Sequence, residues 1–230
     1  MAKDRTAEVM NCLCAVSLFS NLSKTSLLAL ARVSKIQNVE KGEFLFFQSD
    51  PSELAYIVRS GKVSIVLNSP DGRDMVINEM HTGDIFGELG ILTNRPRSTS
   101  AIAHSKSELI VIPRQALLRT MDIEPSLARR ILEITADRLQ RSGERESALA
   151  FMDAQARLAR LLLELEKEEK DKGYVTISQE ELAHRTGLIR QTVAKALGKW
   201  RRAEWLITGR GRILILNYKA LAELEKKLLV

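Results

Sequence analysis

The pattern of hydrophobic and polar positions changes twice along the chain. Residues 6–35 place apolar side chains at helical spacing, with Ser23 as the N-cap of "KTSLLALARV". From Gly42 to Pro113, short apolar runs alternate with glycine- and proline-rich turns at intervals of about ten residues. The expected strands are "EFLFFQ", "LAYIVRSG", "KVSIVLN", "DMVINEM", "AIA" and "ELIVIP". Such spacing predicts an antiparallel jelly roll or sandwich rather than a parallel sheet.

One predicted strand, "KVSIVLN", alternates apolar and polar positions. Val63, Ile65 and Leu67 are expected to point inward, as in a half-buried antiparallel strand. The turn after this strand is expected at Pro70-Asp71-Gly72.

A long helical pattern follows Pro125 and carries an apolar seam near heptad spacing. The seam consists of Leu132, Leu139, Leu149 and Met152. It predicts a helix that pairs with the same helix of a second copy, and packing against the chain's own sheet is the alternative. A new amphipathic run begins at Asp153-Ala154, where we expect a hinge and a domain boundary.

The last third has the punctuation of a helix-turn-helix with a wing. Ser178 and Glu181 form a capping box, Gly187 supplies the turn, and a second helix is expected from about Ile189 to Arg202. "LITGRGRILIL" then reads as two short strands around a tight turn. The predicted class is therefore α+β: a β jelly-roll domain over residues 1–124, a dimerisation helix over 125–153 and a winged helix-turn-helix domain over 154–230.

The charge is distributed unevenly between these parts. The net charge is +6, yet residues 1–153 hold 19 basic and 19 acidic residues, and residues 154–230 hold 16 and 10. A basic module joined to a neutral one indicates a polyanion as partner, and a solvated basic surface without a partner is the alternative.

The second helix of this module has two distinct faces. Val193, Ala196, Leu197 and Trp200 share one face, and the opposite face is polar. Arginine, glutamine and lysine can hydrogen-bond base edges in the major groove of double-stranded DNA, while residues at helix starts and on the wing meet phosphates. The predicted DNA contacts are Ser178, Gln179, Arg190, Gln191, Thr192, Lys195, Arg210 and Arg212.

The sequence gives little support for a membrane protein, a secreted protein, a metalloprotein or an enzyme. No apolar run approaches the ~20 residues of a membrane span and the N-terminus has no signal core, so we expect a cytoplasmic protein. Cys12 and Cys14 are too few for a closed metal site, and the three histidines are scattered. We therefore expect no metal centre. We also expect no enzyme, because no nucleophile is paired with a base in one segment.

The segment "FGELGILTNRPRSTS", residues 86–100, combines the groups that bind an anion. Gly87 allows close approach of backbone N–H groups, Arg97 supplies a guanidinium, and Ser98 and Thr99 supply hydroxyls. Glu88 suits a ligand that also carries sugar hydroxyls. The expected ligand is therefore a sugar phosphate.

With its flanking residues, this segment resembles the phosphate-binding cassette of cyclic-nucleotide-binding domains. Together with "FMDAQARLARLLLEL" and "ISQEELAHRTGLIRQTVAKAL", it makes the chain similar to the CRP/FNR family of bacterial transcription regulators. The resemblance implies a homodimer that binds DNA under the control of a cyclic nucleotide, with cyclic AMP favoured over cyclic GMP, and that contacts RNA polymerase.

The same resemblance assigns roles to individual residues. Arg97 and Ser98 would hold the cyclic phosphate and Glu88 the ribose 2′-OH, while Gly87 and Leu89 would shape the short helix of the cassette. Ser142 matches the position from which the family's cyclic-AMP sensors contact the purine. Gly143 stands where those sensors carry a second hydroxyl, reached from the partner subunit.

The DNA-reading helix both matches and departs from the family pattern. Arg190 matches the guanine-reading arginine, whereas Gln191 replaces the usual Glu, Lys195 the usual Arg, and Ile189 a common capping Ser. Because Glu accepts from cytosine and Gln prefers adenine, we expect an operator related to the TGTGA-type half-site but altered within it.

Several alternatives remain at this stage. The chain could be a regulator of the same family that works without nucleotide or with another effector. An iron-sulfur oxygen sensor would need more cysteines than the chain has. A haem sensor has only His81 as a nearby axial ligand, and a nucleotide-processing enzyme lacks a nucleophile-base pair.

Overall fold

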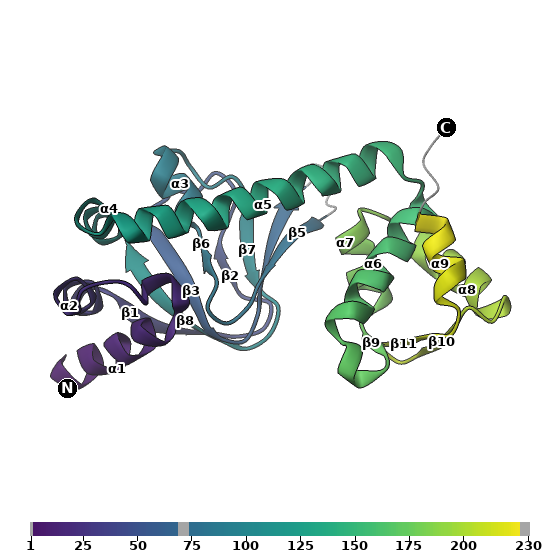
Figure 1. The fold of residues 1–230 in the computed structure, drawn as a ribbon, viewed down its shortest axis with the longest axis horizontal. Helices are drawn as coiled ribbons and strands as arrows, with labels where there is room; N and C mark the ends of the chain where they lie inside the picture. Colours follow the sequence, from purple (N-terminus) through teal and green to yellow (C-terminus); the bar gives the residue numbers. More distant parts are fainter. Residues whose placement is uncertain (1, 69–73, 226–230) are drawn as a thin grey trace. The chain divides into compact units, whose positions relative to one another are not determined.

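A computed structural model of the chain describes residues 2–68 and 74–225 (Figure 1). Its internal contacts divide it into two compact units, Met1–Arg138 and Leu139–Val230, and each is described by itself below. The first unit combines two β-sheets with helices, and the second contains a helical core with a small sheet, so the predicted α+β class is confirmed. None of the described helices combines the length and the apolarity needed to cross a membrane.

The first unit opens with helices α1 (Ala2–Ala15) and α2 (Lys24–Val33), separated by a short 3-10 turn at Ser17–Phe19. The predicted N-cap is confirmed, because the backbone N–H of Ser26 donates to Ser23 Oγ at 3.2 Å. Directly after α2 the chain enters strand β1 (Lys35–Val39), which the sequence pattern did not predict.

Eight strands form two four-stranded antiparallel sheets, ordered β1-β8-β3-β6 and β2-β7-β4-β5. We call this pair of sheets the β-roll. The remaining strands are β2 (Phe44–Phe46), β3 (Leu54–Ser60), β4 (Val63–Asn68), β5 (Asp74–Met80), β6 (Ile85–Phe86), β7 (Ser100–Ala103) and β8 (Ser107–Pro113). All six predicted strands are present. Strand β6, like β1, was not predicted from the sequence pattern.

Strands β3 and β8 are buried on both faces, which explains their unbroken apolar runs. Ile57 and Ile110 point to a core shared with the helices, whereas Val58 and Leu109 point to the core between the two sheets. The same sheet of the β-roll therefore packs against the helices on one face and against the core between the two sheets on the other.

Strand β4 departs from the predicted alternation. Val63 and Ile65 are buried as expected, but Leu67 is 40% exposed. Its pairing with β5 shifts between Ile65 and Val66, which lie opposite Asn78 and Val76, so the extra residue is Ile77 of β5. Leu67 is the next-to-last residue of β4. The predicted turn at Pro70-Asp71-Gly72 lies outside the described residues.

Three helices complete the first unit and lead out of it: α3 (Glu88–Thr93), α4 (Arg114–Ile123) and α5 (Pro125–Phe151). The predicted long helix is confirmed as α5, which is 27 residues long. Two members of its apolar seam, Leu132 and Leu139, are 67% and 73% exposed, whereas Met152 is buried. The side chain of Leu149 lies outside the described part of the chain.

The second unit is built around α6 (Ala154–Glu168), which Asp153 caps by accepting from Ala156 N at 2.7 Å. The other helices are α7 (Gln179–Thr186), α8 (Arg190–Arg202) and α9 (Tyr218–Glu225). Strands β9 (Val175–Thr176), β10 (Leu206–Gly209) and β11 (Arg212–Ile215) pair antiparallel in the order β10-β11-β9. The predicted helix-turn-helix and wing are therefore both present (Figure 1).

Candidate effector and DNA-binding sites

The first candidate site is the segment of residues 86–100, which we call the cassette. Gly87 precedes α3 with a left-handed backbone, φ 75°. A Cβ atom at this position would lie 2.7 Å from Nη1 of Arg97 and would displace the guanidinium, and the positive φ also favours glycine. The glycine predicted from the sequence thus brings the backbone at the start of α3 against the guanidinium.

Arg97 is buried and its guanidinium points into the β-roll. Nη1 donates to Gly87 O at 2.5 Å and Nη2 donates to Leu54 O at 2.6 Å. The guanidinium carbon lies over Phe46, with Cζ 4.1 Å from the ring centroid. Burial lowers the pKa of Arg97, because the charged form loses solvation. Among the described residues, Nε has no hydrogen-bond partner.

Glu88 is also buried, and it forms an ion pair that the sequence did not predict. Arg138, on α5, donates from Nη1 to Glu88 Oε1 at 2.7 Å and from Nη2 to Ile85 O at 2.5 Å. Burial raises the pKa of the Glu88 carboxyl, and the charge of Arg138 opposes that rise. No local signal distinguished Arg138 from the other cations of this helix, because its partner is 50 residues away.

The other predicted effector residues have a more open environment. Ser98 is exposed, Thr99 is half-buried, and the side chain of Leu89 is exposed, so Leu89 contributes to α3 through its backbone. Ser142 belongs to the second unit, where its Oγ lies 3.5 Å from Glu146 Oε1. A Cβ atom at the neighbouring Gly143 would meet no atom within 4 Å among the described residues.

The second candidate site is the exposed face of α8. Arg190, Gln191 and Lys195 are exposed and Thr192 is half-buried, while the opposite face of the helix is buried. That buried face consists of Val193, Ala196, Leu197 and Trp200. The two faces predicted from the sequence are therefore present in the structure, and the hydrophobic face packs into the core of the second unit.

Helix α7 and the wing adjoin the start of α8. Ser178 caps α7 by accepting from Glu181 N at 3.1 Å, as predicted. Ser178, Gln179 and Arg190 line one cavity of about 270 Å³, together with backbone and side chains of the wing. A helix N-terminus and an arginine at one cavity form an environment suited to a phosphate. On the wing, Arg210 and Arg212 are exposed.

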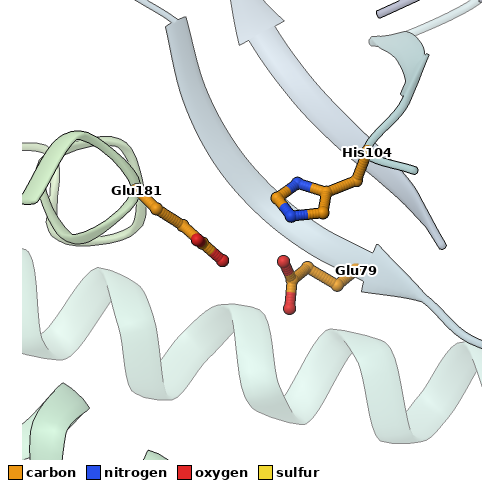
Figure 2. Close-up of side chains that lie close together, drawn as sticks. All are labelled: Glu79, His104 and Glu181. Atoms are coloured by element: carbon orange, nitrogen blue, oxygen red, sulfur yellow. The ribbon is translucent and has the colours of Figure 1, made fainter. Parts of the chain in front are cut away.

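Ionisable groups also gather on the β-roll, away from the cassette. The ligand atoms of Glu79 and His104 lie within 4.8 Å of each other (Figure 2). Glu181, drawn with them, belongs to the second unit. Lys62 already lies 3.4 Å from Glu79, and two protein ligands are fewer than the three or four of usual transition-metal sites.

Comparison with known protein families assigns both units. Residues 36–124 match the family described as the cyclic nucleotide-binding domain. Residues 156–224 match the Crp-like helix-turn-helix domain. The two matches cover the β-roll with the cassette, and the helix-turn-helix with the wing.

A curated relative matches the chain over nearly its whole length. The chain is 30% identical over 216 residues to a CRP-like cAMP-activated global transcriptional regulator of Mycobacterium tuberculosis, which covers 91% of this chain and 96% of the relative.

Solved structures share the fold. FixK2 from Bradyrhizobium japonicum aligns with a TM-score of 0.72 and 25% identity, over 84% of this chain and 98% of that one. The c-di-GMP responsive regulator CLP of Xanthomonas campestris aligns with a TM-score of 0.76 and 24% identity, over 84% of this chain and 99% of that one, and at this identity it shows the fold alone. The chain therefore belongs to the CRP/FNR family of DNA-binding transcription regulators, which are not enzymes.

Proposed function

We propose that the chain is a dimeric, cytoplasmic regulator whose affinity for its operator is set by a cyclic nucleotide in the β-roll, with cyclic AMP favoured over cyclic GMP. The observation that carries this proposal is the contact of Gly87 with the buried guanidinium of Arg97, whose Nε has no hydrogen-bond partner in the part of the chain that the structure describes. A buried cation with an unused donor is suited to an anionic ligand. The named activity of the Mycobacterium tuberculosis relative supports the choice of cyclic AMP.

Each cassette residue has a role in this proposal. Arg97, Ser98 and Thr99 hold the phosphate, and backbone N–H groups at the start of α3 approach it beside Gly87. Glu88 accepts from the ribose 2′-OH, and Leu89 supports α3. Arg138 donates to one carboxylate oxygen of Glu88, Oε1. Because a carboxylate can accept several hydrogen bonds, Glu88 can accept from the ribose as well. Ser142 contacts the purine, while Gly143 offers no second hydroxyl.

Calorimetry with cyclic AMP and cyclic GMP tests the effector. The wild type should bind cyclic AMP more tightly, and Arg97→Ala should weaken binding by about 10- to 100-fold, because charge-assisted hydrogen bonds to the phosphate are lost. Arg95→Ala is the matched control, since Arg95 is exposed two positions earlier and should leave affinity within about twofold. If neither cyclic AMP nor cyclic GMP gave heat, the effector proposal would be contradicted, and the proposal of DNA binding would be unaffected.

A second candidate, a family member that works without nucleotide or with another effector, is favoured by one observation. Arg97 and Glu88 are both hydrogen-bonded within the chain, to Gly87 and Leu54 and to Arg138 respectively. A cassette stabilised in this way could hold the active arrangement unaided. Operator binding that is tight without nucleotide and unchanged by it would establish this candidate.

For DNA, we propose that α8 enters the major groove. Arg190 reads guanine, Gln191 reads adenine, Lys195 meets base or phosphate, and Thr192 adds a phosphate contact. Ser178 and Gln179 hold a phosphate at the start of α7, and Arg210 and Arg212 meet the backbone from the wing.

Arg190→Ala should weaken operator binding by about 5- to 150-fold and relax the preference at one base pair, because a bidentate contact to guanine is lost. Gln191→Glu should shift the neighbouring preference from adenine towards cytosine. Lys219→Ala removes an exposed charge from α9 and serves as the control for net charge. Site selection followed by titration at fixed salt measures all three, and an unaltered TGTGA-type half-site for the wild type would contradict the proposed role of Gln191.

The two sites are coupled, in this proposal, through a dimer. Exposed Leu132 and Leu139 lie one heptad apart on α5, so the helix can pair with that of a second copy. Residues 1–124, 125–153 and 154–230 then serve as effector domain, dimerisation helix and DNA-binding domain. Nucleotide shifts the dimer towards the arrangement that places two α8 helices about 34 Å apart. Such a coupling typically amounts to about 1–3 kcal/mol. RNA polymerase is the further partner that family membership implies.

A further inference from the structure

Three aromatic side chains from both sheets of the β-roll form a cluster beneath Arg97. Phe46 comes from β2, Tyr56 from β3 and Phe86 from β6. Their ring centroids lie 5.8 Å (Phe46–Tyr56), 6.3 Å (Phe46–Phe86) and 5.1 Å (Tyr56–Phe86) apart. Arg97 Cζ lies 4.1 Å from the centroid of Phe46 and 5.9 Å from that of Tyr56. Both distances are within the range of about 6 Å over which a cation is attracted to the face of an aromatic ring.

The hydrogen bonds of Arg97 hold two of its three nitrogens. Nη1 and Nη2 donate to the carbonyl oxygens of Gly87 and Leu54, which are neutral acceptors. Nε is buried and has no partner among the described residues. A buried donor without an acceptor is unfavourable, so its persistence in a well-packed site requires a reason.

We propose that Phe46 is a positioning residue for Arg97: its ring fixes the plane of the guanidinium, so that Nε–H stays available to a phosphodiester oxygen. This inference rests on the proposed nucleotide function of the same site. Phe46 does not touch the ligand in this arrangement. It acts through Arg97, by favouring one orientation of a side chain that otherwise has many rotamers.

The first test replaces the ring and measures affinity for cyclic AMP by calorimetry. Phe46→Leu should weaken binding by about 2- to 30-fold, the range that a cation–π contact supports. Trifluorophenylalanine at position 46 keeps the shape of the ring but depletes the negative charge of its face, and it should also weaken binding. Phe46→Tyr keeps the ring face, so its affinity for cyclic AMP should stay near that of the wild type. Unchanged affinity in the fluorinated protein would overturn the proposal, since that variant packs like the wild type.

A spectroscopic readout separates positioning from packing. In the wild type, the ¹⁵N resonance of Arg97 Nε should shift on addition of cyclic AMP, as Nε–H gains an acceptor. In Phe46→Leu at saturating nucleotide, the shift should be reduced. A full wild-type shift in that variant would mean that Phe46 contributes only to packing, and the proposal would fail.

The test also distinguishes failure of the nucleotide function from failure of this inference. If the wild type binds neither cyclic AMP nor cyclic GMP, the proposed effector is wrong. A double-mutant cycle then tests whether Phe46 and Arg97 interact. Phe46→Leu and Arg97→Met, alone and together, are compared by their equilibrium constants of unfolding. A non-additive effect of about 2- to 30-fold supports the contact, and additive effects overturn it.

Discussion

Replacement of Arg138 by methionine should lower the free energy of unfolding of the first unit by about 3–5 kcal/mol, because it leaves the Glu88 carboxylate buried without its cation. The side chain of Glu88 is 5% exposed, and its bond to Arg138 Nη1 is 2.7 Å long. Chemical unfolding followed by far-UV circular dichroism measures this change. Tryptophan fluorescence reports the other unit, because both tryptophans, Trp200 and Trp205, lie there.

The defect of Arg138→Met should depend on pH in one direction. Burial raises the pKa of Glu88 in the folded chain, and removal of Arg138 takes away an effect that lowers it. The folded state then binds a proton more tightly than the unfolded state, so stability falls as pH rises through the interval between the two pKa values. The loss of stability should therefore be largest at neutral pH and should shrink as the pH falls towards the ordinary pKa of a carboxyl group.

Two variants serve as controls for Arg138→Met. Adding Glu88→Gln should recover much of the lost stability, because the uncompensated charge is gone. Arg130→Met removes a half-exposed arginine that lies 3.0 Å from Glu133 on the same helix, and it should cost less than about 1 kcal/mol. Equal losses for Arg138→Met and Arg130→Met would show that the buried pair contributes no more than a surface pair.

The second large effect is expected at Trp200, which is fully buried at the centre of the second unit. Trp200→Ala should lower the stability of this unit by about 3–5 kcal/mol, through lost contacts and the cavity that remains. Because Trp200 lies on the face of α8 opposite to Arg190 and Gln191, the loss of packing should also abolish specific DNA binding. Fluorescence of Trp205 during chemical unfolding measures the stability, and operator titration measures the binding.

The same variant tests whether the two units are independent. Nucleotide binding by Trp200→Ala should remain near that of the wild type, because the cassette belongs to the first unit and Ser142 lies on α5, outside the core that contains Trp200. Trp200→Phe should cost clearly less stability than Trp200→Ala, since it keeps a ring and removes an indole N–H that has no partner among the described residues. Lys199→Ala, at the exposed neighbouring position, is the control for changes in α8 itself.

Much of the second unit could be predicted because its signals are local. Ser178 and Glu181 form a capping box within one helical turn, and Gly187 adopts the left-handed conformation, φ 67°, that ends α7. Gly211 likewise has a positive φ, 68°, in the turn of the wing. Each of these features depends on residues that are close in sequence, so the pattern specifies it.

The two strands that the sequence pattern missed depend on residues far apart in the chain. Strand β1 forms by pairing with β8, with Lys35 opposite Val111, and the two residues of β6 form by pairing with β3. No short window of sequence around β1 or β6 contains its partner strand.

The sequence by itself determined the family type, the order of the elements, and the residues of the cassette and of the exposed face of α8, because caps, turns and periodicity are encoded by near neighbours. Only the tertiary structure decided which partners the polar and charged groups of those residues have. It placed Arg97 on the ring of Phe46, with no partner for Nε within residues 2–68 and 74–225, and it paired Glu88 with Arg138 on α5. These contacts join β2, α3, α5 and the cassette, and burial makes each of them energetically significant because it removes the water that would otherwise satisfy the same groups.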